Sequence, residues 1–274
     1  MTRILVLGAH PDDAEFWAGG FLARQAKSGS VIRMVSVTNG QSGHQSIPQK
    51  DLIAIRKAEA AEAGRIIGAS YVTGDFPDGS LQPSLELRHW IIKEIREFAP
   101  DLVLTHRPFD YHPDHRAVGQ AVQDASYMVM VPKVVPDVQR PSEEPIVAYM
   151  VDLFTRPCPF RADVVLDVSS ELETVLDMLS CHRSQVFDWL PWIEGIRDQV
   201  PSSGPEQREW LKQWFMAKAN SRIHAFWRGS PLCPELVEAY EISEYAGKPT
   251  QETLNRLFGL DVDHNPTSKQ GNSQ

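Results

Sequence analysis

Two short segments of this 274-residue chain share a pattern of side chains that bind metals and transfer protons. The first is His10-Pro-Asp-Asp13, and the second is His112-Pro-Asp-His115. In each segment the first and fourth residues lie on the same side of a helical turn, where two side chains can meet. Two imidazoles and one carboxylate, with positions left open, are the ligand set of a catalytic zinc ion. The pattern therefore predicts a metal centre that activates water.

The metal ligands are predicted to come from both segments. We expect His10, Asp13 and His115 to bind the metal, which leaves Asp12 beside it as the general base for the bound water. The alternative is that these residues only cap helices. Two copies of the motif at equivalent strand ends favour the metal site.

The two remaining polar residues of the second motif have other predicted roles. His112 is either a general acid or a charged donor to an oxyanion. Asp114 is predicted to orient one of the histidines as part of the catalytic group.

The elements around the motifs alternate between buried strands and helices. Each motif follows a strand, at 3–8 and at 101–105. Further strands are expected at 31–37, 70–73, 146–154 and 163–167, and helices at 11–28, 51–67, 84–98, 114–130, 170–181 and 205–226. This alternation predicts an α/β fold with a mainly parallel sheet. Active sites of such sheets lie beyond the carboxyl ends of the strands, so the two motifs can converge.

Polar residues at the starts of three helices are expected to act as N-caps. These are Asp51, Ser84 and Ser170, whose side-chain oxygens can accept a hydrogen bond from the first helical turn.

A single domain over 1–260 is expected from the chain length. Its part from 186 to 260 is less regular and rich in tryptophan, and it is predicted to be a helical C-terminal elaboration. The tryptophans could form a sugar-stacking surface, a satellite core or a subunit interface. The polar segment 261–274 is predicted to be a disordered tail.

Composition excludes several classes of partner. The formal net charge is −9, and no Lys/Arg-rich stripe is present, which argues against nucleic acid. No apolar run reaches the roughly 18 residues that span a bilayer. The start of the chain lacks the apolar run of a secretory signal, so we expect a cytoplasmic protein. The turn after the first strand lacks G-x-G-x-x-G, which argues against a dinucleotide-binding enzyme.

The two motifs resemble the signatures of the LmbE-like, or PIG-L, family of N-deacetylases. The first signature, Ala-His-Pro-Asp-Asp-x-Glu, matches residues 9–15, and the second, His-Pro-Asp-His, matches 112–115. Two weaker similarities are Arg-Lys-Ala-Glu at 56–59 and His-Arg-Ser-Gln at 182–185. The resemblance covers about residues 3–185.

This resemblance implies a zinc-dependent amide hydrolase with a Rossmann-like three-layer fold. It assigns the metal to His10, Asp13 and His115, the base to Asp12 and the catalytic histidine to His112, in agreement with the residue types. One Zn²⁺ per chain is expected, although Fe²⁺ suits the same ligands. Relatives commonly assemble, so a homo-oligomer is an open alternative.

Three residues are predicted to contact the substrate. Arg56 matches a family arginine near the substrate and could bind a sugar hydroxyl or an anionic aglycone. Tyr111 could supply a hydroxyl to the oxyanion, because Asp110 occupies the position where some relatives have tyrosine. His44, in the loop 38–50, could reach substrate or remain solvated. Trp17 is either a packing residue or a pocket wall.

The predicted function is deacetylation of a small N-acetylated sugar or sugar conjugate. Two alternatives stay open. One is a sugar-binding protein of the same fold without catalysis. The other is a metal-dependent hydrolase of a different amide, an ester or a phosphoester.

Overall fold

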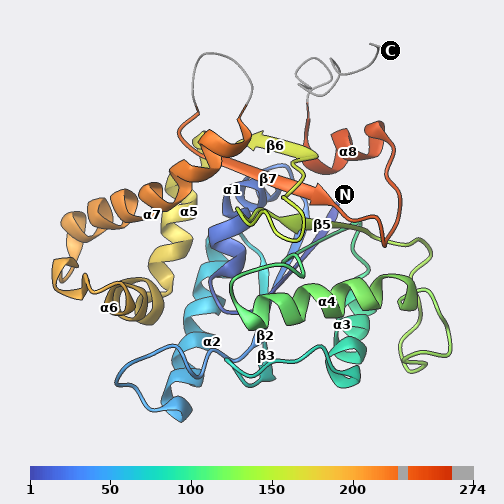
Figure 1. The fold of residues 1–274 in the computed structure, drawn as a ribbon, viewed down its shortest axis with the longest axis horizontal. Coiled ribbons are helices and arrows are strands. Elements are labelled where there is room, and N and C mark those ends of the chain that lie inside the picture. The colour runs from blue at the N-terminus through green and yellow to red at the C-terminus, as the bar shows by residue number, and fades with distance from the viewer. Residues whose placement is uncertain (228–233, 261–274) are drawn as a thin grey trace.

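The strands form one seven-stranded sheet. In chain order they are β1 (Arg3–Gly8), β2 (Val31–Thr38), β3 (Ser70–Phe76), β4 (Leu102–Thr105), β5 (Ile146–Met150), β6 (Val164–Asp167) and β7 (Val237–Ile242). Their order across the sheet is β3-β2-β1-β4-β5-β7-β6 (Figure 1). The first five strands are parallel, whereas β7 is antiparallel to both of its neighbours. This is a computed structural model, and it describes residues 1–227 and 234–260.

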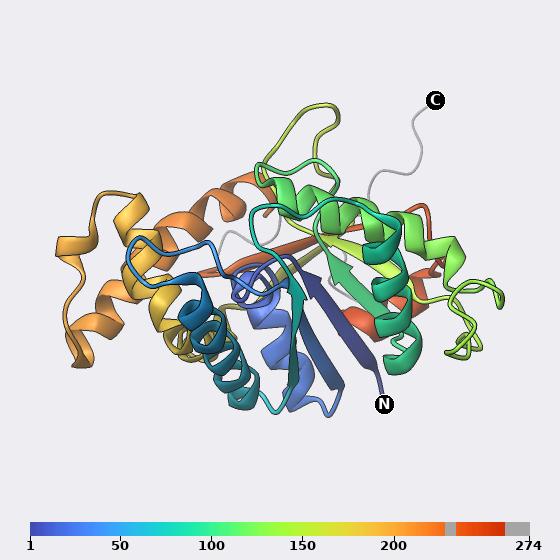
Figure 2. The ribbon, with the colours of Figure 1, turned by 90° about the horizontal axis from the view of Figure 1, so that it is seen from below.

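Helices cover both faces of the sheet (Figure 2). They are α1 (Asp13–Lys27), α2 (Gln49–Ile66), α3 (Leu85–Phe98), α4 (Pro113–Met128), α5 (Leu172–Cys181), α6 (Leu190–Ile193), α7 (Gly204–Phe226) and α8 (Gln251–Phe258). One buried core lies between the sheet and helices that include α1, α5, α7 and α8, and a second lies beneath α3 and α4. The molecule therefore has three layers, and the predicted Rossmann-like fold is confirmed.

Strand β1 lies at the centre of this arrangement because its side chains are apolar on both faces. Ile4 and Val6 belong to one core, and Leu5 and Leu7 belong to the other. It pairs with β2 on one side and with β4 on the other. The chain reverses its direction across the sheet here, and such a switch point opens a crevice at the carboxyl ends of the strands. Both sequence motifs begin at this crevice.

Several predicted boundaries are wrong by a few residues, for local reasons. Helix α1 begins at Asp13 instead of Pro11, because Asp12 has a φ of 110° that no helix accommodates. Helix α2 begins at Gln49 after Pro48, so Asp51 lies inside its first turn and does not cap it. Strand β5 ends at Met150, four residues earlier than predicted, and an irregular loop follows.

The predicted cap of α3 is confirmed, and that of α5 is wrong. The hydroxyl of Ser84 accepts a hydrogen bond from the N–H of Leu87. Ser170 instead lies in a 3₁₀ turn at Ser169–Glu171, and α5 begins after it.

The tryptophans of the C-terminal part do not share one role. Trp210 and Trp214 stack on each other and pack on the core beneath α7. Trp189 stacks on Trp192, beside the site described below. Residues 261–274 and Cys233 lie outside the described residues. Within 1–227 and 234–260, none of the helices has the length and apolarity that a membrane crossing requires.

Candidate metal centre

The three predicted ligands lie together at the carboxyl ends of β1 and β4. His115 Nε2 is 3.3 Å from His10 Nδ1 and 3.3 Å from Asp13 Oδ1, and His10 Nδ1 is 3.7 Å from Asp13 Oδ2. A tetrahedral ion with bonds of about 2.0–2.1 Å to nitrogen and oxygen separates its ligands by about 3.3 Å. The donor set and its spacing therefore fit one face of a tetrahedral zinc site.

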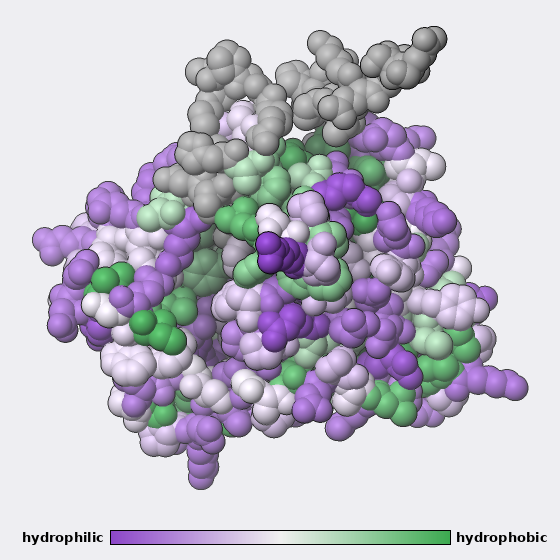
Figure 3. All heavy atoms as spheres, in the orientation of Figure 1, coloured by the Kyte–Doolittle hydropathy of each residue, from purple (hydrophilic) through white to green (hydrophobic). Residues whose placement is uncertain are grey.

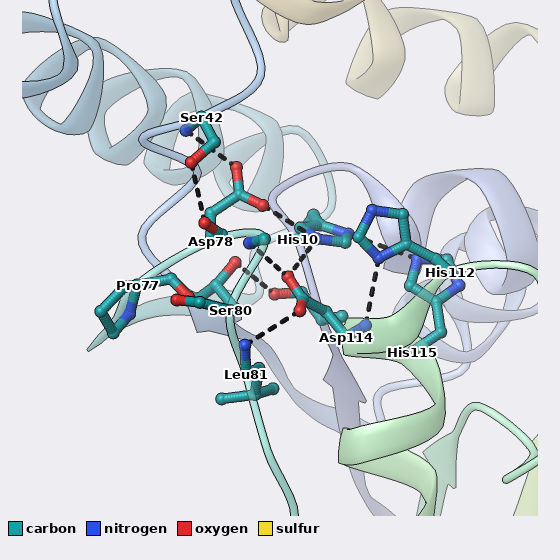
Figure 4. A network of polar contacts seen from close by, with 12 residues as sticks. His10, Ser42, Pro77, Asp78, Ser80, Leu81, His112, Asp114 and His115 are labelled. Carbon is teal, nitrogen blue, oxygen red and sulfur yellow. Dashed lines mark hydrogen bonds and ion pairs between the residues drawn. The ribbon is translucent and has the colours of Figure 1, made fainter.

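Carboxylates hold the other ring nitrogen of each histidine. His10 Nε2 lies 3.1 Å from Asp114 Oδ2 and 3.2 Å from Asp78 Oδ1 (Figure 4). His115 Nδ1 lies 3.1 Å from Asp110 Oδ1. Such contacts fix the orientation of a ligating imidazole and direct its free lone pair toward the metal. Asp114 is itself fixed, because its carboxylate accepts hydrogen bonds from the N–H groups of Gly79 and Leu81.

These contacts shift the titration of the metal-free site. Burial lowers the pKa of His10, but the hydrogen bonds to Asp114 and Asp78 outweigh it, so its pKa is raised well above the usual range. The neighbouring Asp13 and Asp110 raise the pKa of His115 to about 9 in spite of its burial. Burial opposes ionisation of Asp13, yet the imidazoles of His115 and His106 hold its pKa well below normal.

A tight turn brings the first motif into this geometry. The N–H of Asp13 donates to the carbonyl of His10, and the N–H of His10 donates to Asp13 Oδ2 at 2.7 Å. Gly8 makes room for this turn, since a Cβ at position 8 would lie 2.8 Å from Asp13 Cβ. The sequence analysis correctly predicted that His10 and Asp13, the first and fourth residues of the motif, lie on the same side. A tight turn brings them together instead of a regular helix.

Asp12 lies beside the ligands in a conformation that costs energy. Its φ of 110° is in a region that residues other than glycine rarely adopt. Its N–H donates to the hydroxyl of Tyr71 at 3.3 Å, and its carboxyl group is buried. Burial and the charge of Asp13 raise the pKa of Asp12 to about 7. A general base is most effective when its pKa lies near the working pH.

His112 caps helix α4 at the edge of the site. Its Nδ1 accepts a hydrogen bond from the N–H of Asp114 at 3.2 Å, and its ring meets that of His10 edge to face. Burial and the nearby histidines lower its pKa. Because Nδ1 accepts this hydrogen bond, a neutral ring would carry its proton on Nε2. The two roles expected for His112, a general acid or a charged donor to an oxyanion, stay predictions.

The structure adds three acidic or basic residues that the sequence analysis did not assign to the site. Asp78 and Asp110 contact the two histidine ligands, and His106 Nε2 lies 3.0 Å from Asp13 Oδ2 and stacks on His115. Asp78 follows the carboxyl end of β3, so its position at the same sheet edge was the available signal. The sequence analysis considered Asp110 only as the residue that replaces the oxyanion-binding tyrosine of some relatives.

A polar pocket of about 200 Å³ opens next to these residues. Arg56 lines it and is only 1% exposed, with Nη2 donating to the carbonyl of Gly43 and Nε lacking a partner among the described residues. Gln185 and Trp189 also line it, from a π-helical turn at Ser184–Trp189. The pocket is concave and combines apolar surface with a few converging polar groups, as small-molecule sites do.

The other two predicted substrate residues differ in position. Tyr111 lines this pocket and is mostly exposed. His44 instead accepts hydrogen bonds on Nδ1 from the N–H groups of Ser46 and Ile47, which shapes its own loop. Its role in substrate binding stays a prediction.

Fold and site together define a class: a three-layer α/β protein with His and Asp side chains that could hold a metal ion at the switch point of a parallel sheet. Residues 5–126 match the family model PIG-L, described as GlcNAc-PI de-N-acetylase. This part of the chain contains both motifs, so the resemblance found in the sequence is confirmed.

Known proteins of two named activities are similar to this chain. Diacetylchitobiose deacetylase of Thermococcus kodakarensis is 25% identical over 207 residues, which cover 72% of this chain and 76% of that protein. 4-Oxalmesaconate hydratase of Pseudomonas putida is 24% identical over 193 residues, 68% of this chain and 74% of that protein. The solved structure of N,N'-diacetylchitobiose deacetylase from Pyrococcus horikoshii has a TM-score of 0.70 at 20% identity, covering 89% of this chain and 84% of that one.

Proposed function

We propose that this chain is a metal-dependent hydrolase that removes the acetyl group from a small N-acetylated sugar or sugar conjugate. The observation that carries the proposal is the close approach of His10, Asp13 and His115, whose ring nitrogens and carboxylate oxygens lie 3.3–3.7 Å apart. The buried Asp12 precedes Asp13 in the sequence. The match to the GlcNAc-PI de-N-acetylase family and the similarity to a diacetylchitobiose deacetylase support this choice of reaction.

One Zn²⁺ per chain is the proposed cofactor, held by His10, Asp13 and His115, and Fe²⁺ suits the same ligands. When bound, such an ion lowers the pKa of water to about 7 and polarises a carbonyl group.

The remaining steps belong to the protein. Asp12 accepts the proton of the attacking water, and its pKa of about 7 lets it release that proton again near neutral pH. The Nε2–H of His112 donates a hydrogen bond to the oxyanion of the tetrahedral intermediate. The leaving amine then takes the proton that Asp12 accepted from the water, so Asp12 returns to its starting state. Asp114 keeps His10 oriented throughout.

Substrate binding is assigned to the polar pocket. Arg56 has unused donor capacity on a buried guanidinium, which suits a sugar hydroxyl or an anionic group of the aglycone. Tyr111 is proposed to close one side of the bound acetamide, and His44 to contact the outer part of the conjugate.

The test pairs metal content with product formation. Metal is measured by mass spectrometry in wild-type protein and in the His115→Ala variant, and acetate release is measured on a panel of N-acetylglucosamine conjugates. We expect about one zinc per chain, its loss in the variant, and acetate release only by metal-loaded wild type. His89→Ala, which removes an exposed histidine of α3, is the matched control and keeps both properties.

Other outcomes identify the alternatives. Metal without acetate release, together with hydration of 4-oxalmesaconate, would favour the activity for which the hydratase relative is named. Metal without any turnover would favour a sugar-binding protein. A chain that takes up no metal would refute the proposal.

The cytoplasmic location and the assembly state complete the proposal. We expect a cytoplasmic protein, which cell fractionation tests. Light scattering of the purified chain measures whether it is a homo-oligomer.

A further inference from the structure

The side chain of Tyr111 borders two different pockets. One is the polar pocket described above, and the other has a volume of about 270 Å³. Asp110, which contacts His115 Nδ1, also lines the second pocket. The second pocket is therefore one side chain away from the proposed metal ligands.

Apolar side chains make up most of the wall of this second pocket. Trp17 comes from helix α1, and Val151, Leu153 and Phe154 come from the loop after β5. Trp17 also packs on the core, so both of the roles considered for it in the sequence apply. In Figure 3, hydrophobic residues gather near the centre of the face, where Figure 1 places the loop between β5 and β6.

The charged side chains at the edge of the second pocket already have partners within the protein. Asp152 receives two hydrogen bonds from Arg107, at 2.5 and 2.8 Å, and Lys218 contacts Glu194 at 2.6 Å. Asp110 accepts a hydrogen bond from the N–H of His112 and contacts His115. A molecule entering this pocket therefore meets mainly apolar surface, together with carboxylates that already have partners within the protein.

The size of the pocket exceeds the needs of an acetyl group. An apolar cavity of about 150 Å³ holds a benzene molecule, whereas acetyl carries a single methyl group. Leu153 and Phe154 are 49% and 41% exposed, so their apolar surface is available to a ligand in this pocket. The loop is fixed in position, because the N–H of Phe154 donates to Asp152 and its carbonyl accepts from Arg107.

We propose that this pocket binds an apolar hydrocarbon group of the substrate, several carbon atoms long, attached within reach of the hydrolysed amide. The inference rests on the proposed function and narrows its substrate class. Such a group is either the chain of an N-acyl group longer than acetyl or an alkyl or aryl aglycone of the sugar. Both sources offer the same hydrocarbon chemistry to the pocket.

Two substrate series separate the sources. The first is N-acetyl-, N-butyryl-, N-hexanoyl- and N-octanoylglucosamine, and the second is the methyl, butyl, hexyl and phenyl glycosides of N-acetylglucosamine. In the series that uses the pocket, kcat/KM rises about fourfold for each added methylene until the pocket is full. A rise in the first series assigns the acyl group, and a rise in the second assigns the aglycone.

Two variants test whether the rise in kcat/KM with chain length depends on the second pocket. Phe154→Ala removes an exposed ring and keeps the backbone bonds of the loop, and Leu153→Trp narrows the pocket. In the series that uses the pocket, we compare kcat/KM for the six-carbon compound (hexanoyl or hexyl) with kcat/KM for the shortest compound. Each variant is expected to lower this ratio at least tenfold. Tyr127→Ala, an exposed aromatic residue of α4, leaves this ratio unchanged. Flat series in the active wild-type enzyme, or an unchanged ratio in both pocket variants, overturns the inference.

If the protein hydrolyses no amide, the proposed function fails, and the apolar pocket is then tested by ligand binding alone. Calorimetry then compares hexanamide with acetamide and hexyl β-D-glucoside with methyl β-D-glucoside. At least tenfold tighter binding of one hexyl compound, lost in Phe154→Ala, supports the apolar pocket. Equal binding within both pairs rejects it.

Discussion

His182 Nε2 lies 2.7 Å from Glu15 Oε1, and both side chains are fully buried. The other oxygen of Glu15 contacts the hydroxyl of Tyr71, which in turn accepts the N–H of Asp12. A residue near the end of α5 is thereby connected to the backbone of the proposed general base. His182 thus has a structural contact and lies outside the three groups of potential metal ligands among the described residues.

This buried pair predicts a pH dependence of stability. Burial lowers the pKa of His182, but Glu15 outweighs it and the pKa is raised above its usual value of 6.5. The folded state therefore keeps a proton that the unfolded state releases. The pair contributes its full stabilisation below pH 6.5 and loses it as the pH rises through the raised pKa. Glu15→Gln should cost about 3–5 kcal/mol at the acidic end of this window.

Urea unfolding of both proteins across pH measures this effect. The difference in unfolding free energy between wild type and Glu15→Gln should shrink as the pH rises. Glu86→Gln, an exposed residue of α3, should show a small difference that is constant with pH. A constant large difference for Glu15→Gln would mean that the proton of His182 is not involved.

Asp12→Asn separates metal binding from catalysis. Asparagine tolerates a positive φ better than alanine does, so the backbone at φ 110° is retained. We expect kcat for acetate release to fall about 10²–10⁴-fold, because the general base is lost, while the metal content is unchanged. Asp75→Asn, at an exposed position of β3, is the control. Full activity in Asp12→Asn would remove Asp12 from the mechanism.

The sequence was sufficient to predict that the two motifs meet. Each motif follows a strand predicted from an apolar run, at 3–8 and at 101–105, and the rule for parallel sheets correctly brought the two segments together. The partners of the ligands were harder to predict, because Asp78 reaches His10 from a loop whose course depends on tertiary packing. The conformation of Asp12 was also hidden, since nothing in Pro-Asp-Asp signals a left-handed residue.

Asp114→Asn tests the orientation of His10. The N–H groups of Gly79 and Leu81 bond to different oxygens of Asp114, so asparagine keeps one of these two hydrogen bonds and loses the other, and the negative charge beside His10 Nε2 is removed. Metal affinity should fall about 10–100-fold. Competition with a fluorescent chelator measures it, and Asp124→Asn, exposed on the same helix, should bind as wild type does. Unchanged affinity would show that Asp78 alone orients His10.

Gly8→Ala tests the close approach of the first turn. The added Cβ would lie 2.8 Å from Asp13 Cβ, so the turn that carries the ligand must shift. We expect a loss of about 1–3 kcal/mol in stability, measured by urea unfolding, together with weaker metal binding. Normal metal binding would mean that the turn adapts without moving Asp13.

The pairing of β1 with β4, which aligns Ile4 with Leu102, determines when the site can form. During synthesis His10 and Asp13 leave the ribosome first. They can meet His115 only after residue 115 has also emerged. At typical elongation rates this delay is roughly ten seconds. The nascent chain can fold β1, β2 and β3 in that time, but it has only two of the three proposed ligands. Metal capture is therefore expected to mark the closing of the sheet, late in the folding of this part of the chain.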